Sequence, residues 1–181
     1  IEVIVIMIES LSLLGLKDIT LSLGNTALFN ALCESANLSN QDSLALRDIF
    51  RRKSIPDLNG FLKNNQIQKA DKFKTLISLD GSENVLDKAN SVFKDIPSAL
   101  TALNGLRELY AFFKDHNINL MFDLGEVKAY EYHDGVVFAA YHESFSKALA
   151  QGGRYSGLTK SFGSSRGATG FSFDLKFLVQ Q

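Results

Sequence analysis

The sequence contains very little cysteine and no excess of charge of either sign. Cys33 is the single cysteine among 181 residues, so no disulfide can form within the chain, and a reducing cytoplasm is the expected location. The formal net charge of -1 gives no electrostatic reason to expect binding to nucleic acid or to an anionic membrane. The composition therefore argues against both of these partners.

Long apolar runs of the kind that span a membrane are also missing. The apolar run from Val3 to Ile8 is too short for a membrane span, and no basic segment precedes it as in a signal peptide. Glu2 and Glu9 lie one heptad apart, so they fall on the same helical face. We interpret Val3–Ile8 as part of a buried core helix. We interpret the chain, which begins with Ile1, as an internal fragment of a longer protein.

The residues that are present predict a globular domain with mixed secondary structure. Apolar residues make up 45% of the chain and charged residues 22%, which is ordinary for a domain with a hydrophobic core. A first helix is expected to end at a capping Gly15. Ile19, Leu21 and Leu23 then alternate with polar residues, the period of a half-buried strand. Thr26 is expected to cap the next helix.

Helix-start signals recur through the middle of the chain. Ser39 and Ser54 each stand three positions before an acidic residue, which is the spacing of a helix N-cap. Ser98 is expected to open a long helix. The chain has only two prolines, and both Pro56 and Pro97 stand at these expected entries, where proline is tolerated. We predict a helical insertion over about 38–117.

Few residues suggest a metal or nucleotide site. His116 and His142 lack a second ligand at metal-binding spacing, so no metal site is expected. No Walker loop, Rossmann fingerprint, nucleophile elbow or zinc signature is present. The helical region holds a basic cluster, which consists of Arg47, Arg51, Arg52 and Lys53. We expect this cluster to be a solvated helix face, with an anion site as the alternative.

The C-terminal third changes to the period of strands. Ile118, Leu120 and Phe122 form one alternating run, and a second strand is expected over 127–132. His133-Asp134-Gly135 is typical of a tight hairpin turn leading into a partner strand over 136–138. Glycine-rich turns are expected at 152–153 and 163–167. The segment 168–179 is expected to begin as a strand and end as a helix.

Three segments in this region carry the motifs of one known family in the family's own order. They read KAYEYHDGVVF at 128–138, GGRYSGL at 152–158 and ATGFSFDL at 168–175. They resemble the two histidine-recognition motifs and the third class II motif of histidyl-tRNA synthetases. GLKDITLSLG at 15–24 resembles the strand after their second class II motif. The resemblance implies an α+β fold, in which an antiparallel sheet of the class II aminoacyl-tRNA synthetase type carries flanking helices and a helical insertion. Residues 1–181 are then a fragment of such a domain.

Two positions depart from the pattern of active synthetases. Lys128 stands where the family has an arginine that reaches the reacting carboxylate and phosphate, and lysine lacks the planar fork of a guanidinium group. Phe177 stands where an arginine of motif 3 stacks on the adenine of ATP, and Lys176 precedes it where an acid is usual. Phenylalanine can stack but carries no charge. The resemblance therefore implies a protein without aminoacylation activity.

The pattern Tyr-x-Tyr-His-x-Gly, followed by VFAAY, resembles the regulatory paralogues of the synthetases, the regulatory subunits of ATP phosphoribosyltransferase. This implies a cytoplasmic protein of histidine biosynthesis that binds the short catalytic subunit and contributes to feedback inhibition by histidine. A homodimer within a hetero-oligomer, with no cofactor, is expected. Two alternatives stay open: a divergent histidyl-tRNA synthetase core, or a fragment that retains only a dimer-forming scaffold.

The resemblance also assigns a histidine pocket. Its expected residues are Glu131, Tyr132, His133, Arg154 and Tyr155, with Gly152 and Gly153 allowing a close approach of the backbone. Tyrosine can stack on an imidazole ring and hydrogen-bond to its edge. Structural interpretations stay open for each. Tyr132 could pack against the sheet, Arg154 could form an internal ion pair, and the glycines could serve a turn.

Overall fold

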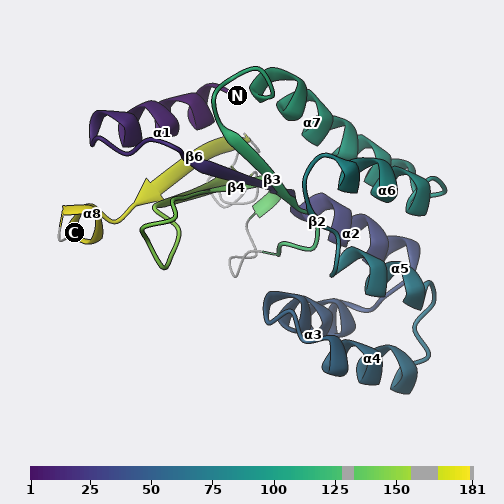
Figure 1. The fold of residues 1–181 in the computed structure, drawn as a ribbon. Coiled ribbons are helices and arrows are strands. Elements are labelled where there is room, and N and C mark those ends of the chain that lie inside the picture. The colour runs from purple at the N-terminus through teal and green to yellow at the C-terminus, as the bar shows by residue number, and fades with distance from the viewer. Residues whose placement is uncertain (128–132, 156–166, 180–181) are drawn as a thin grey trace.

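A mixed sheet of six strands forms the centre of the computed structural model, which describes residues 1–127, 133–155 and 167–179 (Figure 1). The strand order is β2-β3-β1-β4-β5-β6. The strands are β1 (Thr20–Asn25), β2 (Asp80–Gly81), β3 (Asn119–Asp123), β4 (His133–Tyr141), β5 (Ala150–Tyr155) and β6 (Ala168–Phe173). Neighbouring strands are antiparallel except β1 and β3, which are parallel. The expected antiparallel sheet is therefore wrong at this one pair. A parallel pair needs a long crossover, and the helices between β1 and β3 provide it.

Helices cover one face of this sheet and extend beyond one end of it. They are α1 (Glu2–Leu13), α2 (Thr26–Ser35), α3 (Asn40–Arg51), α4 (Ile55–Asn64), α5 (Ala70–Leu76), α6 (Asn84–Val92), α7 (Pro97–Phe113) and α8 (Leu175–Val179). Figure 1 shows α1 and α7 above the sheet, with α3 and α4 beyond its end at the lower right. The segment predicted as a helical insertion thus contains α3 to α7 and only the two-residue strand β2.

Side-chain caps explain several of the helix boundaries. The hydroxyl of Ser39 accepts the N–H of Asp42 at 3.0 Å, and that of Ser54 accepts the N–H of Asp57 at 3.4 Å, as the sequence predicted. Gly15 adopts a φ of 81°, in the left-handed region, and ends α1.

Two predicted helix starts are wrong by one or two residues. The cap of α2 is Asn25 rather than Thr26. Asn25 ends β1 in an extended conformation, which places its side-chain oxygen to accept the N–H of Ala27 at 3.1 Å. The N-cap position of α7 is Ile96 rather than Ser98, because Pro97 lacks an N–H and can begin a helix without a side-chain cap.

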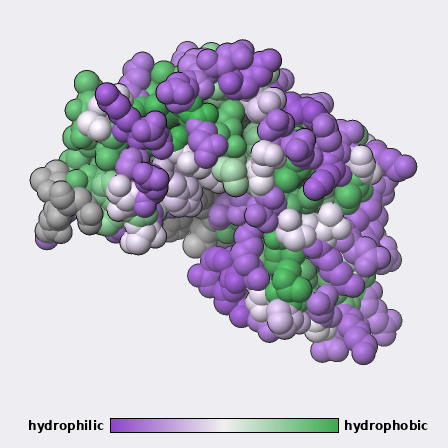
Figure 2. Space-filling model, viewed as in Figure 1, coloured by the Kyte–Doolittle hydropathy of each residue, from purple (hydrophilic) through white to green (hydrophobic). Residues whose placement is uncertain are grey.

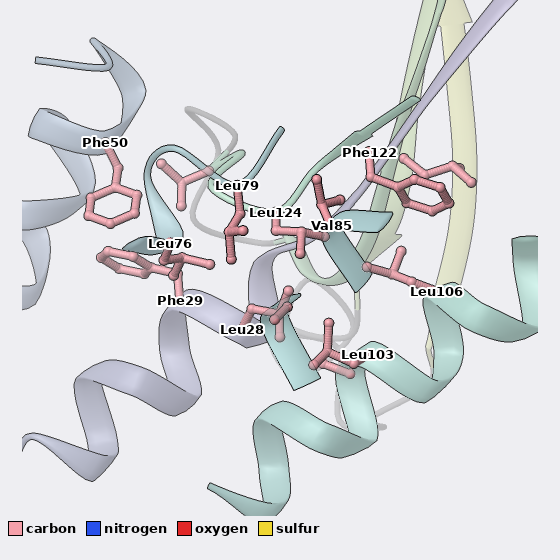
Figure 3. Close-up of a cluster of buried hydrophobic side chains, with 14 of the residues drawn as sticks. Leu28, Phe29, Phe50, Leu76, Leu79, Val85, Leu103, Leu106, Phe122 and Leu124 are labelled. Atoms are coloured by element: carbon pink, nitrogen blue, oxygen red, sulfur yellow. The ribbon is translucent and has the colours of Figure 1, made fainter. Parts of the chain in front are cut away.

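The hydrophobic core joins the sheet to the helices without a break. Figure 3 shows side chains from α2, α3, α5, α6, α7 and β3, and from the loops after α5 and β3, meeting in one cluster. Phe29 of α2 and Phe50 of α3 pack edge to face with ring centroids 5.0 Å apart, and Phe50 contacts Phe73 of α5 in the same way. The helical segment is therefore packed onto the same core as the sheet.

The first helix is only partly the buried helix that its apolar run predicts. Ile4, Met7 and Leu11 are buried, because they recur at helical spacing on the side that faces the core. Ile6 is 54% exposed and Leu13 is 89% exposed, since both lie on the opposite side of the helix. The expectation that the whole of Val3–Ile8 is buried is wrong for Ile6.

The predicted hairpin turn at Asp134-Gly135 and the predicted turn at 152–153 are both wrong. His133–Tyr141 is one continuous strand that pairs with both β1 and β5, so the chain does not reverse at Gly135. The extra residues form a bulge: His133 pairs with Tyr155, whereas Val137 pairs with Gly153. Gly152 lies inside β5, where a β-carbon would stand 2.6 Å from the Phe138 ring. This glycine serves close packing within the sheet.

Candidate functional site

The two faces of the sheet differ in chemistry. Side chains alternate along a strand, and paired residues share a face, so the register assigns each position to one side. The face beneath α1 and α7, called here the helix-covered face, carries large buried side chains such as Leu21, Leu23 and Phe138. The opposite face, called here the polar face, carries mainly small and polar side chains: Thr20, Ser22, Gly24, Ala139, Tyr141, Gly153 and Tyr155.

Among the predicted pocket residues that the structure describes, Tyr155 and His133 have neighbouring backbones. Their backbones pair directly across β4 and β5. Tyr155 is half-buried on the polar face, beside Gly170 of β6, where an added β-carbon would lie 3.9 Å from its hydroxyl oxygen. Small residues here leave room for a ring to stand against the sheet. This end of β4 and β5 is the candidate site.

Arg154 does not join Tyr155 in this place. As the preceding residue of β5 it faces the helix-covered side, paired with Thr169. It lines an open groove of about 580 Å³ between the start of α1 and the second half of α7, together with Glu2, Glu108 and Val136. The sequence hypothesis that Arg154 stands at the rim of a pocket holding Tyr155 is therefore not supported by the register.

Three further residues of the hypothesis, Lys128, Glu131 and Tyr132, lie outside the described residues, and their roles stay predictions. The strand predicted over 127–132 and most of the turn predicted over 163–167 also fall there. Of His133 only the backbone is described.

Phe177, which the resemblance aligns with an adenine-stacking arginine of active synthetases, lies in α8. Its ring packs edge to face against Phe145, with centroids 5.5 Å apart. The ammonium group of Lys147 lies 3.9 Å from the centre of the same ring, a cation–π contact. The expected order of a strand and then a helix over 168–179 is confirmed by β6 and α8.

The polar face also includes Asp123, Glu126 and Tyr141, which the sequence analysis did not assign to a site. Ser22, Gly24, Glu126 and Tyr141 line a small cavity on this face. Partial burial raises the pKa of Tyr141 above its ordinary value, and the negative charges of Glu126 and Asp123 raise it further. The alternation of Val137, Ala139 and Tyr141 along one strand was the available signal for Tyr141, but nothing in the sequence placed Glu126 beside it.

The side chains of the basic cluster form ion pairs and hydrogen bonds with other residues of the chain. Arg51 pairs with Asp48, and Arg52 with Asp48 and Asp57 at 3.1 and 2.7 Å. The remaining two cations are also held: Arg47 donates to Asn30 and lies over the Phe29 ring, and Lys53 pairs with Asp123. These internal partners, and the exposure of Arg51, Arg52 and Lys53, favour the predicted solvated helix face over an anion site.

The described residues offer few other groups that could react or bind a metal. Burial raises the pKa of the Cys33 thiol to about 11, so it stays protonated and packs as a small apolar side chain. Within 1–127, 133–155 and 167–179, no group of three or more His, Cys, Asp or Glu side chains is placed to hold a metal ion. The helices that the structure describes include none with the length and apolar character needed to cross a bilayer.

The sheet, its helix-covered face and its small, polar opposite face define a domain of the class II synthetase type. The family model for histidyl-tRNA synthetase matches residues 1–178, and the chain belongs to that family. This confirms the resemblance on which the motifs were assigned.

Individual relatives agree with this family. The ATP phosphoribosyltransferase regulatory subunit of Nitrosococcus oceani is 38% identical over 182 residues, which cover 98% of this chain and 46% of that protein. An ATP phosphoribosyltransferase regulatory subunit/histidyl-tRNA synthetase from Bacillus halodurans C superposes with a TM-score of 0.87 at 27% identity, covering 99% of this chain and 48% of the other. The ATP phosphoribosyl transferase (HisG:HisZ) complex from Thermotoga maritima contains a chain with the same fold, with a TM-score of 0.70 at 18% identity over 95% of this chain and 59% of that one. The chain thus spans about half the length of the curated relatives it matches.

Proposed function

We propose that the protein to which this chain belongs is a regulatory subunit of ATP phosphoribosyltransferase. The observation that carries the proposal is the 38% identity to a protein of that name, extending over 98% of the chain. The Thermotoga complex, in which a chain of this fold is found, supports assembly with a catalytic subunit. In this role the protein works in the cytoplasm as a dimer within a hetero-oligomer and binds histidine as a feedback effector.

The protein is proposed to lack aminoacylation activity. Synthetases of this family use one arginine to hold the reacting phosphate and another to stack on adenine, whereas this chain has Lys128 and Phe177 at those positions. Phe177 brings no charge of its own, and its ring is engaged by Phe145 and Lys147. Loss of one preorganised donor to a developing charge typically costs about 100-fold to 1000-fold in rate.

Histidine is proposed to bind on the polar face at the end of β4 and β5. The pairing of His133 with Tyr155, and the half-burial of the Tyr155 side chain, support an aromatic wall for an imidazole ring at this place. Glu131 and Tyr132 are proposed to complete the pocket from the segment that precedes β4. Gly153 and Gly170 pair across β5 and β6, so neither of these two positions places a side chain beside Tyr155.

Reconstitution of the complete protein with the short catalytic subunit tests this function. The expected result is a faster ATP phosphoribosyltransferase reaction in the assembled complex, inhibition by histidine, and no histidine-dependent exchange of pyrophosphate into ATP. Exchange clearly above a control without protein, together with no effect on the transferase, would establish the alternative, a divergent histidyl-tRNA synthetase. Titration calorimetry of the complete protein with histidine checks the effector separately.

A further inference from the structure

The loop after β3 brings a glutamate onto the polar face of the sheet. Gly24 of β1 makes this possible, because a β-carbon there would lie 2.6 Å from the carbonyl oxygen of Asp123 and 3.3 Å from the β-carbon of Glu126. Leu124 and Val127, which flank the glutamate in the loop, are both 1% exposed and anchor it in the core. The partly buried Glu126 therefore lies against β1 at a position that has no side chain of its own.

Three polar residues line a cavity at this place. The cavity has a volume of about 10 Å³, which is room for one water-sized group, and its lining includes Glu126, Ser22 and Tyr141. Within the part of the chain that the structure describes, none of these three side chains forms a hydrogen bond or an ion pair. One carboxylate and two hydroxyls are thus left to be satisfied by water or by a ligand.

The electrostatic surroundings of the cavity favour a positively charged ligand. Glu126 supplies a negative charge at the cavity wall, and the lysine that reaches this loop, Lys53, pairs with Asp123 instead. Partial burial raises the pKa of the Tyr141 phenol, and the charges of Glu126 and Asp123 raise it further. The phenol therefore stays neutral at pH 7 and can offer its oxygen to a donor.

A wider groove adjoins the cavity and shares Ser22 and Tyr141 with it. Its volume of about 390 Å³ is within the usual range for small-molecule sites. Met121 and Tyr141 line it and are 37% and 41% exposed, so they offer apolar surface, and Glu143 adds a second carboxylate. Among the described residues, no lysine or arginine lines either space. The two spaces together fit a small molecule with an apolar body and a cationic end.

We infer that Glu126, Ser22 and Tyr141 form a binding site for a small molecule that carries a protonated amino group. The ammonium group enters the cavity and donates to the carboxylate and to the two hydroxyl oxygens, which matches its three N–H donors. The body of the ligand lies in the groove against Met121. Tyr141 and the backbone partner of Tyr155 stand at opposite ends of β4, so this site does not rest on the proposed function.

The first experiment uses butylamine, which is protonated at pH 7, as the probe of the complete protein. Nuclear magnetic resonance should show saturating shifts of the amides of 22, 24 and 139–141. The dissociation constant should be on the order of 1 mM, the affinity expected of so small a ligand. Butanol has the same shape without the charge and should cause no saturating shift there. Absence of these shifts with butylamine, or equal binding of butanol, would overturn the inference.

Substitutions then test the three residues. Glu126→Gln keeps the shape, removes the charge and should weaken butylamine binding about 10-fold to 150-fold. Tyr141→Phe and Ser22→Ala each remove one acceptor and should weaken it about 2-fold to 10-fold. Glu108→Gln is the matched control, because this carboxylate of α7 lines the groove on the helix-covered face, and it should bind butylamine as the wild type does. Equal affinity in Glu126→Gln and Glu108→Gln would refute the site.

Competition with histidine identifies the source of the amino group. Displacement of butylamine by histidine, with weaker histidine binding in Glu126→Gln, would assign the cavity to the ammonium group of the effector itself. Histidine binding that is unchanged in Glu126→Gln and does not displace butylamine would assign it to a separate amine. Both results support the site. A wild-type protein that binds butylamine but no histidine would contradict the proposed effector and leave this inference standing.

Discussion

The two faces of the sheet differ in packing: one is covered by helices, and the other carries the proposed histidine site. On the helix-covered face, Leu21, Leu23, Phe122 and Phe138 are at most 2% exposed and pack beneath the helices. On the polar face, Thr20, Ser22 and Gly24 of the same strand β1 alternate with them and point the other way. One strand therefore supplies both faces. A substitution on the helix-covered face should destabilise the fold, whereas one in the proposed histidine site on the polar face should affect binding.

The surface of the helices adds a second contrast. Hydrophobic surface gathers over α1 at the upper left of Figure 2, whereas α6 and α7 present mostly hydrophilic atoms. Leu13 and Leu14 are among the exposed apolar residues of this part of the chain. Of the two helices above the helix-covered face, α7 thus has the more polar solvent-facing surface and α1 the less polar one.

The largest expected effect belongs to the helix-covered face. Phe138→Ala removes a ring that is 2% exposed and fills the space above Gly152. The free energy of unfolding should fall by about 3–5 kcal/mol, the usual cost of removing a buried phenylalanine ring. Denaturant melts of the complete protein measure it. A loss below about 1 kcal/mol would contradict the assignment of this face to the core.

A smaller loss is expected where glycine lets the strands pack closely. Gly152→Ala would bring a β-carbon to 2.3 Å from the carbonyl oxygen of Gly170, so the strands must shift and stability should fall by about 1–3 kcal/mol. Gly105→Ala in α7 is the control, because nothing lies within 4 Å of its β-carbon position. The control should stabilise by about 0.5–1 kcal/mol, since alanine favours a helix over glycine. Equal melting midpoints for the two variants would contradict the close contact.

Gly152 also shows what the sequence could and could not predict. Local signals were sufficient for the strands over Ile19–Leu23 and Ile118–Phe122 and for the caps at Ser39 and Ser54, because each depends on neighbours along the chain. Gly152 was expected in a turn, since glycine is a common turn residue, and only the approach of Phe138 and Gly170 shows why it stands in a strand.

Features that depend on pairing between distant segments could not be predicted in this way. Asp134-Gly135 reads as a hairpin, but His133 pairs with Tyr155 and Val137 with Gly153, so the strand continues through a bulge at this place instead of reversing. The parallel pairing of β1 with β3 and the ion pair of Lys53 with Asp123 both join segments that are far apart in the chain. The family motifs predicted Tyr155 and His133 as residues of the candidate site. The side of the sheet that Arg154 faces follows only from the register.

For a substitution in the proposed site on the polar face, we expect a change in inhibition by histidine rather than in folding stability. Tyr155→Ala should weaken inhibition of the assembled complex by histidine about 5-fold to 150-fold, because one contact to a buried ligand is worth roughly 1–3 kcal/mol. Assembly with the catalytic subunit should be unchanged. Arg154→Ala, at the adjacent position on the other face, is the control and should leave inhibition near the wild-type level. An unaltered inhibition curve for a folded, assembled Tyr155→Ala variant would move the effector to another site.

The smallest effect is expected on the outer side of α1, and it tests whether helical spacing rather than apolar composition decides burial there. Ile6 is 54% exposed, so Ile6→Ala should change the free energy of unfolding by no more than about 0.5 kcal/mol. Ile4, two positions earlier and 2% exposed, provides the comparison: Ile4→Ala should cost about 2–5 kcal/mol. Both variants remove the same atoms from the same helix, so their difference in denaturant melts measures burial alone. Equal losses would mean that the outer side of α1 is covered in the complete protein, and the size of the Ile6→Ala loss would then report how fully.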